Sequence, residues 1–327
     1  MNGHERDVCP LCESFDKTEI KNIPYTEIWS GLEKEWKASF SKEVIERHSP
    51  CEFTTLVECR NCGLEYFVPI VAGDSQFYHE LSQSPRYYNQ SQWEFGFVKR
   101  KLLFTDRVLD IGCGEGSFLS SIHEQVQQAI GIDMNPLAIT RATAAGLDAK
   151  RTDIINFAQT HGGMFDIVCC FQVIEHLPRI KPFIKAAVSC LKPNGLLILS
   201  VPNRQRIFQN PLDALDCPPH HVSRWDSKPL TKLGEIMGLR LSEIVFEMAN
   251  RIASREWFRE NLLRKYGIAY WMKRGVARIC FSSPFFEIYK RTGWLEKWGF
   301  YRLTILAYYR KNQPRNFLID RESSICH

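Results

Sequence analysis

The segment 108–116 contains the residue types that bring a ligand close to a protein backbone. It reads Val-Leu-Asp-Ile-Gly-Cys-Gly-Glu-Gly, which is an apolar run, three alternating glycines and the start of a helical pattern. Glycine permits close approach and unusual dihedral angles, and a helix start presents unpaired N–H groups and a positive dipole end. These features suit a ligand carboxylate. The spacing differs from the Gly-x-Gly-x-x-Gly of dinucleotide-binding folds.

Two acids follow the next apolar runs and could bind the polar parts of a nucleoside. Asp133 ends the run 129–132, where its carboxylate can accept both hydroxyls of a ribose. Pro136 follows closely, so a helix N-cap is the alternative role for Asp133. Asp153 either faces an adenine amino group or caps the segment 154–160.

A histidine pair supplies the chemistry for proton removal. His220 and His221 lie in Cys-Pro-Pro-His-His-Val-Ser-Arg-Trp, where two prolines stiffen the approach. Imidazole has the intrinsic pKa of a general base near neutral pH. We expect His221 first and His220 second to be catalytic. The alternative is that the pair only orients the loop by stacking on Trp225.

Four cysteines near the N-terminus have the spacing of a metal site. They form two Cys-x-x-Cys knuckles, Cys9–Cys12 and Cys59–Cys62, which can place four thiolates around one zinc ion. Four thiolates close the coordination shell, so the zinc should be structural. Strand-like residues 54–58 and 64–68 flank the second knuckle as in a zinc ribbon. The segment between the knuckles is long, and we expect an inserted helical stretch at 25–47; unrelated cysteines without metal are the alternative.

Short apolar runs alternate with helical segments after residue 106, and these elements must position the candidate residues. The predicted strands are 107–111, 128–132, 149–151, 165–171 and 196–201, with 239–246 and 302–309 as the last two. Helical patterns at 116–125 and 136–145 lie between them. Alternating strands and helices predict an α/β fold with a parallel sheet covered on both faces.

The chain divides into segments that differ in composition and in hydrophobic pattern. We expect a zinc-ribbon-like domain at 1–70, a helical connector at 71–105 and an α/β domain formed by 106–248 and 301–312. A basic, aromatic helical insert at 249–300 separates the last two strands, and 313–327 is a tail.

The motifs, taken in order, resemble those of the class I methyltransferases. They are VLDIGCGEG, GIDMNP, RTDI, FDIVCCFQVIEHLP and LKPNGLLILSVPN, and they cover about 106–248 and, less completely, 302–310. The resemblance is closest to the ubiquinone-type O-methyltransferases and the sugar or glycan methyltransferases. It implies a Rossmann-like, doubly wound, mostly parallel seven-stranded sheet that binds S-adenosylmethionine. A Rossmann-like domain for another nucleotide is the alternative.

The resemblance also implies a role for each matching residue. The methionine end of the cofactor would contact Asp110, Gly112, Gly114 and Gly116. The ribose would contact Asp133, with Met134 also counted as cofactor-binding, and the adenine would contact Asp153 and Ile154. Gln172 and Val173 would lie under the sulfonium. In these families a similar histidine lies near the acceptor, whereas a Glu-His pair such as 175–176 more often shapes the pocket wall.

The expected reaction is methyl transfer to an O or C atom of a small molecule, and we expect this acceptor to be a sugar, nucleotide sugar or glycan. A zinc ribbon followed by a methyltransferase domain resembles the organisation of sugar methyltransferases. Some ribosomal-RNA methyltransferases also begin with a cysteine knuckle. An RNA methyltransferase and a non-catalytic S-adenosylmethionine-binding module are the two alternatives. Neither the Asn/Asp-Pro-Pro-Tyr of amino-directed nucleic-acid enzymes nor the Pro-Cys of pyrimidine C5 enzymes follows the fourth predicted strand.

Charge is concentrated in one segment. The net charge is +5, too small to indicate nucleic acid. Residues 250–300 contain eleven Lys/Arg and four Glu. We favour a helical cap that packs its apolar stripe on the core or on a second copy in an oligomer. A lid over a phosphate-bearing acceptor and peripheral contact with an anionic membrane are the alternatives.

Cysteine usage and hydropathy indicate the compartment. Eight of the twelve cysteines have no common spacing, which favours a reducing environment. No run approaches the roughly 18 apolar residues of a membrane span, and the first residues lack a signal-peptide pattern. We expect a cytoplasmic protein.

Overall fold

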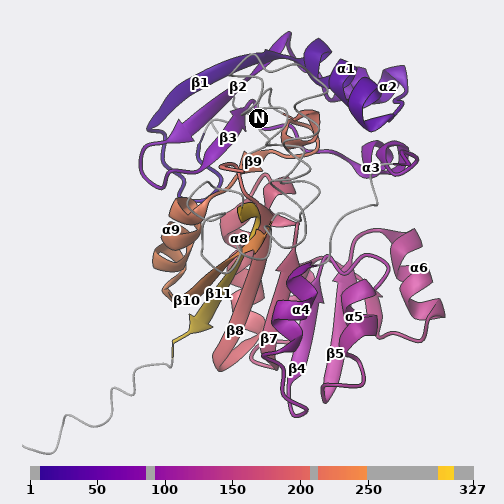
Figure 1. Ribbon diagram of the computed structural model, residues 1–327, viewed down its shortest axis with the longest axis vertical. Coiled ribbons are helices and arrows are strands. Elements are labelled where there is room, and N and C mark those ends of the chain that lie inside the picture. The colour runs from indigo at the N-terminus through magenta and orange to yellow at the C-terminus, as the bar shows by residue number, and fades with distance from the viewer. Residues whose placement is uncertain (1–7, 86–92, 207–212, 249–300, 313–327) are drawn as a thin grey trace, which may run out of the picture.

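The structure is a computed structural model that describes residues 8–85, 93–206, 213–248 and 301–312. Two sheets organise these residues: a seven-stranded sheet and, above it in Figure 1, a four-stranded sheet built largely from the N-terminal part of the chain.

The larger sheet has the strand order β10-β11-β8-β7-β4-β5-β6. Its strands are β4 (Arg107–Ile111), β5 (Gln128–Asp133), β6 (Ala149–Arg151), β7 (Phe165–Phe171), β8 (Leu191–Pro202), β10 (Leu239–Met248) and β11 (Tyr301–Lys311). Strands β6, β5, β4, β7 and β8 run parallel, and β11 lies antiparallel to both β8 and β10. The expected mostly parallel, seven-stranded, Rossmann-like sheet is therefore confirmed.

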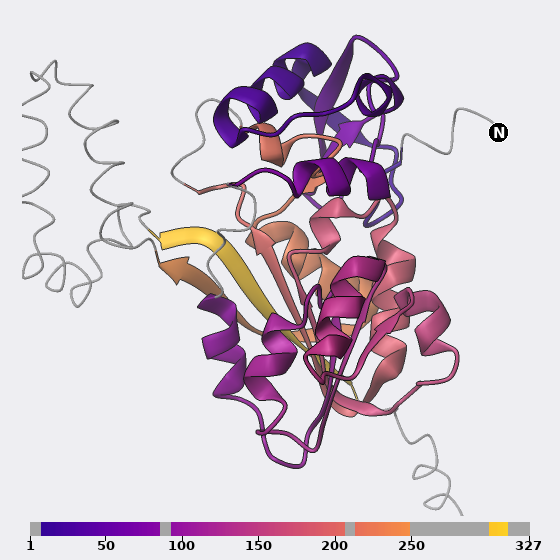
Figure 2. The same cartoon turned by 90° about the vertical axis from the view of Figure 1, so that its right-hand side faces the viewer.

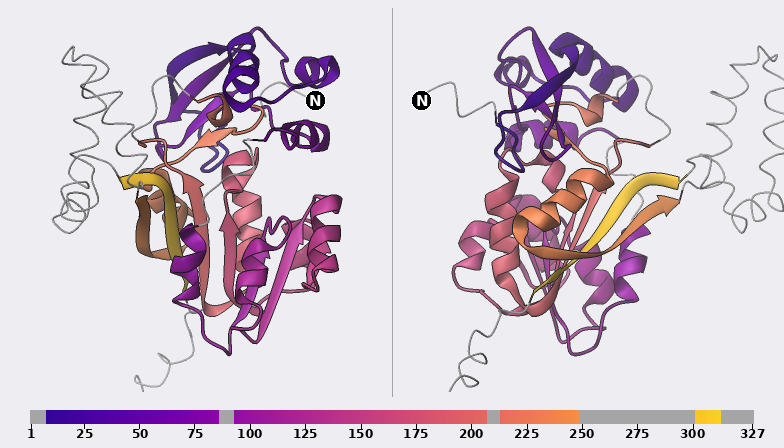
Figure 3. Two further views of the ribbon diagram at one scale, coloured as in Figure 1. Left: turned by 45° about the vertical axis from the view of Figure 1, so that its right-hand side comes forward. Right: turned by 90° about the vertical axis from the view of Figure 1, so that its left-hand side faces the viewer.

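Helices cover both faces of this sheet, which explains why its central strands are almost wholly apolar. One face carries α4 (Trp93–Lys99), α5 (Ser117–Ile122) and α6 (Pro136–Ala144). The other carries α7 (Ile154–Ala158), α8 (Ile180–Cys190) and α9 (Ser227–Met237). Figure 3 shows α9 beside the edge formed by β10 and β11.

Side-chain caps set several helix starts. Asn135 caps α6 by accepting from the N–H groups of Leu137 and Ala138, with Pro136 as the first helical residue. Asp153 caps α7, and Asp226 caps α9. The cap of α6 is thus Asn135, and the alternative role predicted for Asp133 as that cap is wrong.

The smaller sheet is antiparallel, with the order β1-β2-β3-β9. Its strands are β1 (Lys17–Pro24), β2 (Phe53–Cys59), β3 (Glu65–Val68) and β9 (Ser223–Arg224). The expected helical stretch between the knuckles consists of α1 (Tyr25–Trp36) and α2 (Lys42–Arg47), and the connector contributes α3 (Ser75–Leu81). The pattern of the sequence did not predict β1 or β9.

The two sheets are joined through the segment after β8. Glu65 and Tyr66 of β3 pair with Arg224 and Ser223 of β9. Cys9, Cys59 and Tyr66 belong to the same hydrophobic cluster as the α8 and α9 face of the larger sheet. Figure 2 shows the N-terminal unit above the ends of the parallel strands, so it covers the edge at which the candidate residues lie.

The basic insert predicted at 249–300 and the tail at 313–327 lie outside the described residues. None of the helices that the structure describes combines the length and the apolar character of a membrane-spanning segment.

Neighbouring tyrosines on β11 provide a matched test of the packing between β11 and α9. Tyr309 is buried and donates its hydroxyl to the carbonyl oxygen of Leu230, 2.7 Å away. The buried hydroxyl of Tyr308 has no hydrogen-bond partner among the described residues. We expect Tyr309→Phe to lower the free energy of unfolding by about 1 kcal/mol, because it removes a buried hydrogen bond. Tyr308→Phe should leave the free energy of unfolding unchanged or raise it. Equal losses of this free energy in the two variants, measured by denaturant titration, would contradict this packing.

Candidate active site

The glycine turn after β4 is tied to the end of β5. Gly112, Gly114 and Gly116 all have positive φ angles, 77°, 53° and 84°. The N–H groups of Gly112 and Cys113 donate to the carbonyl oxygen of Ile132 at 2.8 and 3.1 Å. These contacts hold the turn at the carboxyl edge of the sheet, where open α/β folds bind ligands.

The three glycines have different surroundings. A Cβ at Gly112 would lie 2.5 Å from Val173 Cγ2, and one at Gly116 would lie 2.4 Å from Leu147 Cδ1. A Cβ at Gly114 would meet no described atom within 4 Å. Packing therefore requires glycine at the first and third positions, whereas the second leaves space for a ligand to approach the backbone.

The other predicted cofactor residues follow the neighbouring strands at the same edge. Asp133 ends β5 and accepts from the N–H groups of Gly114 (2.9 Å) and Asn135 (2.7 Å). Asp153 follows β6 and accepts from Asn156 N at 2.9 Å, so its predicted capping role is observed. Met134 is largely exposed, whereas the side chain of Ile154 is in the core.

The end of β7 contributes the remaining predicted cofactor residues at this edge of the sheet. Gln172 has a left-handed backbone (φ 55°) and donates from Nε2 to Ser200 Oγ at 3.1 Å. Ser200 in turn donates to Glu94 Oε1 at 3.3 Å. Glu94 is buried, and burial raises its pKa to about 7. Glu94 and Ser200 were not predicted as site residues, although Ser200 lies within the motif at 191–203.

Asp110 makes the glycine turn a favourable place for positive charge. Its side chain is only 2% exposed. Burial, with the nearby charge of Asp133, raises the pKa of Asp110 to about 8. A cationic group beside these carboxylates would stabilise the ionised form of Asp110, as the amino group of an amino-acid ligand can.

Three histidines from two segments meet near the ends of β7 and β8. His176 ends the 3₁₀ turn Ile174–His176, and His220 and His221 lie in the loop after the second 3₁₀ turn, Ala214–Asp216. Ring centroids are 4.8 Å apart for His176 and His220, 4.9 Å for His176 and His221, and 4.3 Å for His220 and His221. We call these three residues the histidine cluster. Its rings pack on one another, while the buried Trp225 donates from Nε1 to Ser223 Oγ.

Burial keeps two members of the cluster neutral. Burial, with the nearby charge of His221, lowers the pKa of His176 to about 3. The same causes lower the pKa of His220 well below its usual value. A neutral imidazole has a lone pair that can bind a metal ion, whereas the lowered pKa makes each of these two rings a weaker proton acceptor.

Asp216 orients His221. Its Oδ1 lies 3.4 Å from His221 Nδ1, and its Oδ2 accepts from the guanidinium of Arg206 at 2.6 Å. Burial alone would raise the pKa of Asp216, but the charge of Arg206 and the interactions with His221 hold it well below its usual range. Sequence reasoning missed Asp216, because its contact with His221 depends on how the loop folds.

The histidine loop is held from several sides. Val222 N donates to the carbonyl oxygen of Glu175 at 2.9 Å, and Phe67 N of β3 donates to that of Val222 at 3.2 Å. Tyr78 of α3 places its hydroxyl 3.0 Å from His176 Nδ1. The N-terminal unit, the connector and the α/β domain thus all contribute to the position of the cluster.

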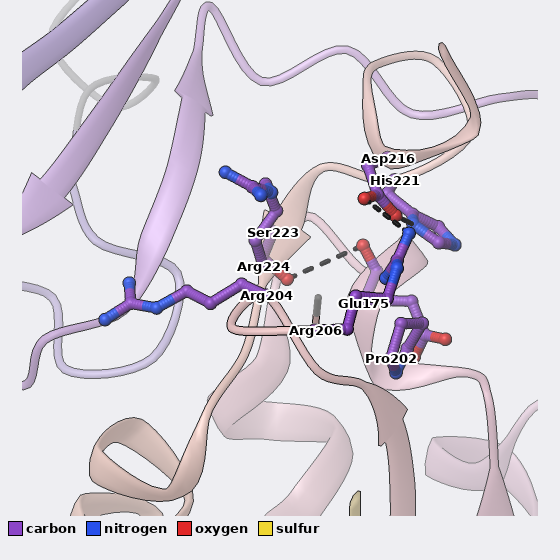
Figure 4. Close-up of a pocket in the computed structure, with 8 residues that line it drawn as sticks. All are labelled: Glu175, Pro202, Arg204, Arg206, Asp216, His221, Ser223 and Arg224. Carbon is purple, nitrogen blue, oxygen red and sulfur yellow. Dashed lines mark hydrogen bonds and ion pairs between the residues drawn. The ribbon is translucent and has the colours of Figure 1, made fainter. Parts of the chain in front are cut away.

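A polar pocket lies beside the cluster (Figure 4). Its lining consists of Glu175, Pro202, Arg204, Arg206, Asp216, His221, Ser223 and Arg224. Glu175 is 1% exposed, and burial raises its pKa to about 8. Neither oxygen of its carboxylate has a hydrogen-bond partner among the described residues.

The four predicted metal ligands come together away from this pocket. Cys9 Sγ lies 3.5 Å from Cys62 Sγ, and Cys12 Sγ lies 3.4 Å from Cys59 Sγ. All four sulfur atoms lie within 4.8 Å of one another. Sulfurs around a tetrahedral zinc ion with bonds of about 2.3 Å are about 3.8 Å apart, so the donor set fits zinc. The exposed Cys51 is not part of this group.

Comparisons with known proteins agree with this arrangement. A family profile described as a methyltransferase domain matches residues 78–244, more than half of the chain. A ubiquinone biosynthesis O-methyltransferase of Yersinia enterocolitica is 33% identical over 108 residues, which are 31% of this chain and 45% of that protein. A protein of the same name from Yersinia pestis is 32% identical over the same shares. The chain therefore spans about half the length of the curated relatives it matches.

Among solved structures, a SAM dependent methyltransferase from Archaeoglobus fulgidus is similar with a TM-score of 0.46 and 20% identity. The match covers 73% of this chain and 100% of that one.

The raised pKa of Asp110 predicts a pH dependence of stability. Between its unfolded value near 3.8 and its folded value of about 8, the folded state binds the extra proton, so the free energy of unfolding falls as pH rises. We expect Asp110→Asn to make this slope less negative, on the order of 1 kcal/mol per pH unit. Denaturant titrations from pH 5 to 7.5 measure the slope, and parallel curves for the two proteins would contradict the burial argument.

Proposed function

The chain belongs to the methyltransferase-domain family, of the class I type, and on that premise we propose that it transfers a methyl group from S-adenosylmethionine to an oxygen atom of a small-molecule acceptor. The observation that carries this proposal is the juxtaposition at one sheet edge. Asp110 and Asp133 lie near the carboxyl ends of β4 and β5, the open face of Gly114 follows β4, and the histidine cluster follows β7 and β8. The named O-methyltransferase relatives support oxygen as the acceptor atom.

We propose that the cofactor lies along the row of residues at the carboxyl edge. Gly112, Gly114, Gly116 and Asp110 would hold the methionine end, because Gly114 leaves room and Asp110 favours a cation. The remaining contacts would be Asp133 and Met134 at the ribose, Asp153 and the backbone of Ile154 at the adenine, and Gln172 and Val173 below the sulfonium.

The proposed chemistry needs little acid catalysis, because S-adenosylmethionine supplies a methyl group whose departure leaves a neutral thioether. The protein must align the acceptor and remove its proton. We propose that the acceptor hydroxyl is activated at the histidine loop, with His221 the first and His220 the second residue responsible. Asp216 would position His221 through Nδ1.

The pocket lining supports a proposal for the acceptor class. Seven of the eight lining residues are polar or charged. Such a lining suits a ligand with several hydroxyl groups better than an apolar phenol. We therefore propose a sugar, nucleotide sugar or glycan as the acceptor.

Product analysis tests this function. The protein is incubated with isotopically methyl-labelled S-adenosylmethionine and a library of sugars, nucleotide sugars and apolar phenols, and products are identified by mass spectrometry. A labelled O-methyl sugar supports the proposal. Transfer only to RNA, or cofactor binding with no transfer to any acceptor, would overturn it in favour of an RNA methyltransferase or a binding module.

We also propose that Cys9, Cys12, Cys59 and Cys62 bind one structural zinc ion. The distances between their sulfurs and their burial support this assignment. The ion would stabilise the sheet that holds the histidine loop through β9.

Gly114→Ala should weaken binding of S-adenosylhomocysteine at least ~10-fold, measured by calorimetry. The added methyl group meets no described atom, so it would occupy the space proposed for the ligand. Gly146→Ala is the matched control, because Gly146 also has a positive φ and an open side. Both variants should lose about 1–2 kcal/mol of stability from backbone strain. If Gly114→Ala and Gly146→Ala bind S-adenosylhomocysteine with equal affinity, the proposed cofactor pocket is wrong.

His221→Ala should lower kcat on the acceptor found in the product analysis by ~100-fold or more, since activation of the hydroxyl is worth at least that much. Its affinity for S-adenosylhomocysteine should not change. His123→Ala, at an exposed position, is the control. Full activity of His221→Ala would remove this residue from the mechanism.

Cys9→Ser should lower the zinc content by about one ion per chain, measured by inductively coupled plasma mass spectrometry. It should also lower the temperature of unfolding. Cys51→Ser changes an exposed cysteine outside the group and should leave both values unchanged. An unchanged zinc content in Cys9→Ser would exclude the site.

A further inference from the structure

The histidine cluster has the spacing of a metal-binding site in addition to its place beside the pocket. One ring nitrogen of each residue, His176, His220 and His221, lies within 4.8 Å of one ring nitrogen of the other two. The residues come from two separate segments, so the spacing is not the result of one helix or strand. The packed loops around the cluster keep the three rings together.

The hydrogen bonds of the three rings determine which nitrogen can bind a ligand. Nδ1 of His176 lies 2.7 Å from the carbonyl oxygen of His220, and Nδ1 of His220 lies 2.8 Å from that of Leu215. Nδ1 of His221 faces Asp216 Oδ1. A carbonyl or carboxylate oxygen can only accept, so these three contacts use each Nδ1 as the donor and leave each Nε2 as the nitrogen that can bind a ligand. Metal-binding histidines show this same pattern, in which the second nitrogen donates to a carbonyl or carboxylate.

Glu175 supplies an independent indication of a ligand. Its carboxylate is nine-tenths buried or more, and neither oxygen has a hydrogen-bond partner in the part of the chain that the structure describes. Its Oε1 lies 4.0 Å from His176 Nε2 and the residue lines the pocket shared with His221. A buried carboxylate without a hydrogen bond is costly, and a cation at the cluster would compensate it.

We propose that His176, His220 and His221 bind a divalent transition-metal ion of the zinc class, with Glu175 facing it and one position left open to the pocket. Three neutral imidazoles with an open fourth position are a donor set typical of catalytic zinc. Nitrogens bound at about 2.0–2.1 Å would be about 3.3 Å apart. The rings would therefore draw together on binding.

The catalytic role of this ion rests on the proposed function. The ion would explain how the histidine loop activates the acceptor hydroxyl. The hydroxyl oxygen of the acceptor binds the open position, which lowers its pKa. Its proton passes to a water molecule in the pocket. A lone pair of that oxygen forms the new C–O bond, and the electrons of the broken C–S bond remain on the sulfur of S-adenosylhomocysteine.

Cobalt titration tests the site on the whole protein. Co²⁺ is added to protein whose cysteine site is loaded with zinc, and bound cobalt is measured by equilibrium dialysis and by its absorption spectrum. We expect one additional equivalent without the thiolate-to-metal charge-transfer bands that a cysteine site would give. Their absence separates the histidine cluster from the four cysteines.

Matched variants identify the ligands. His221→Gln and His176→Gln should each weaken cobalt binding at least ~10-fold, and Asp216→Asn, which weakens the contacts of residue 216 with His221 and with Arg206 without removing a ligand, by roughly 10- to 100-fold. His123→Gln, at an exposed histidine, should bind as the wild type does. Binding of S-adenosylhomocysteine and the temperature of unfolding show whether each variant is folded. If a histidine variant does not fold, the cobalt affinity of Asp216→Asn decides the test.

The outcomes separate this proposal from the proposed function. No additional cobalt in the wild type, or equal binding by His221→Gln and His123→Gln, would overturn the metal site. Methyl transfer that persists without any additional metal would also overturn it and would leave His221 as a direct base. Cobalt binding by a protein that methylates no acceptor would support the site and overturn the methyltransferase function.

Discussion

The pairing of β3 with β9 is the contact on which the acceptor side of the molecule depends. Only Ser223 and Arg224 take part in β9, yet they follow the histidine loop directly. Ion pairs reinforce the contact: Arg224 and Arg204 both bind Glu65, at 2.7 and 3.2 Å, and Arg204 Nε donates to Asp226 at 2.7 Å. Buried ion pairs contribute more to a specific geometry than to stability, and here they fix the loop against the cysteine-bearing sheet.

The strand order of the larger sheet supplies the second constraint. Because β7 lies between β4 and β8, the glycine turn after β4 and the histidine cluster after β7 and β8 lie at the same sheet edge, although more than 100 residues separate Gly112 from His221. The side chains between them, Gln172 and Val173, come from the end of β7. A ligand that extends from the turn toward β8 therefore meets the cluster. The N-terminal unit above this edge limits access from solvent, which strengthens electrostatic interactions at the site.

The α/β part of the structure was predictable from local patterns, whereas the acceptor side was not. The predicted strands 107–111 and 165–171 match the observed bounds, because buried parallel strands are largely apolar runs bordered by glycine and acidic residues. The four cysteines were also found, since knuckle spacing is a local signal. Strand β9 has two residues and no pattern of its own, so only the tertiary contact with β3 creates it.

The same reason explains the site residues that sequence reasoning missed. His176 was expected to shape the pocket wall, but its meeting with His220 and His221 depends on how two distant loops pack. Asp216 and Tyr78 act on the histidines through contacts that no spacing rule describes. Asp133 is a different case, because the sequence allowed two roles and the actual cap of α6 is its neighbour Asn135.

We propose that the glycine turn and the histidine cluster face one another across a single reaction site. A crystal structure of the complex with S-adenosylhomocysteine measures this most directly. The account predicts that the amino-acid end lies on the turn 112–116 and that the sulfur faces the rings of His176 and His221, with space for one acceptor group between them. A complex in which the sulfur points away from the histidine cluster, or in which the adenine fills the space beside it, would contradict the account.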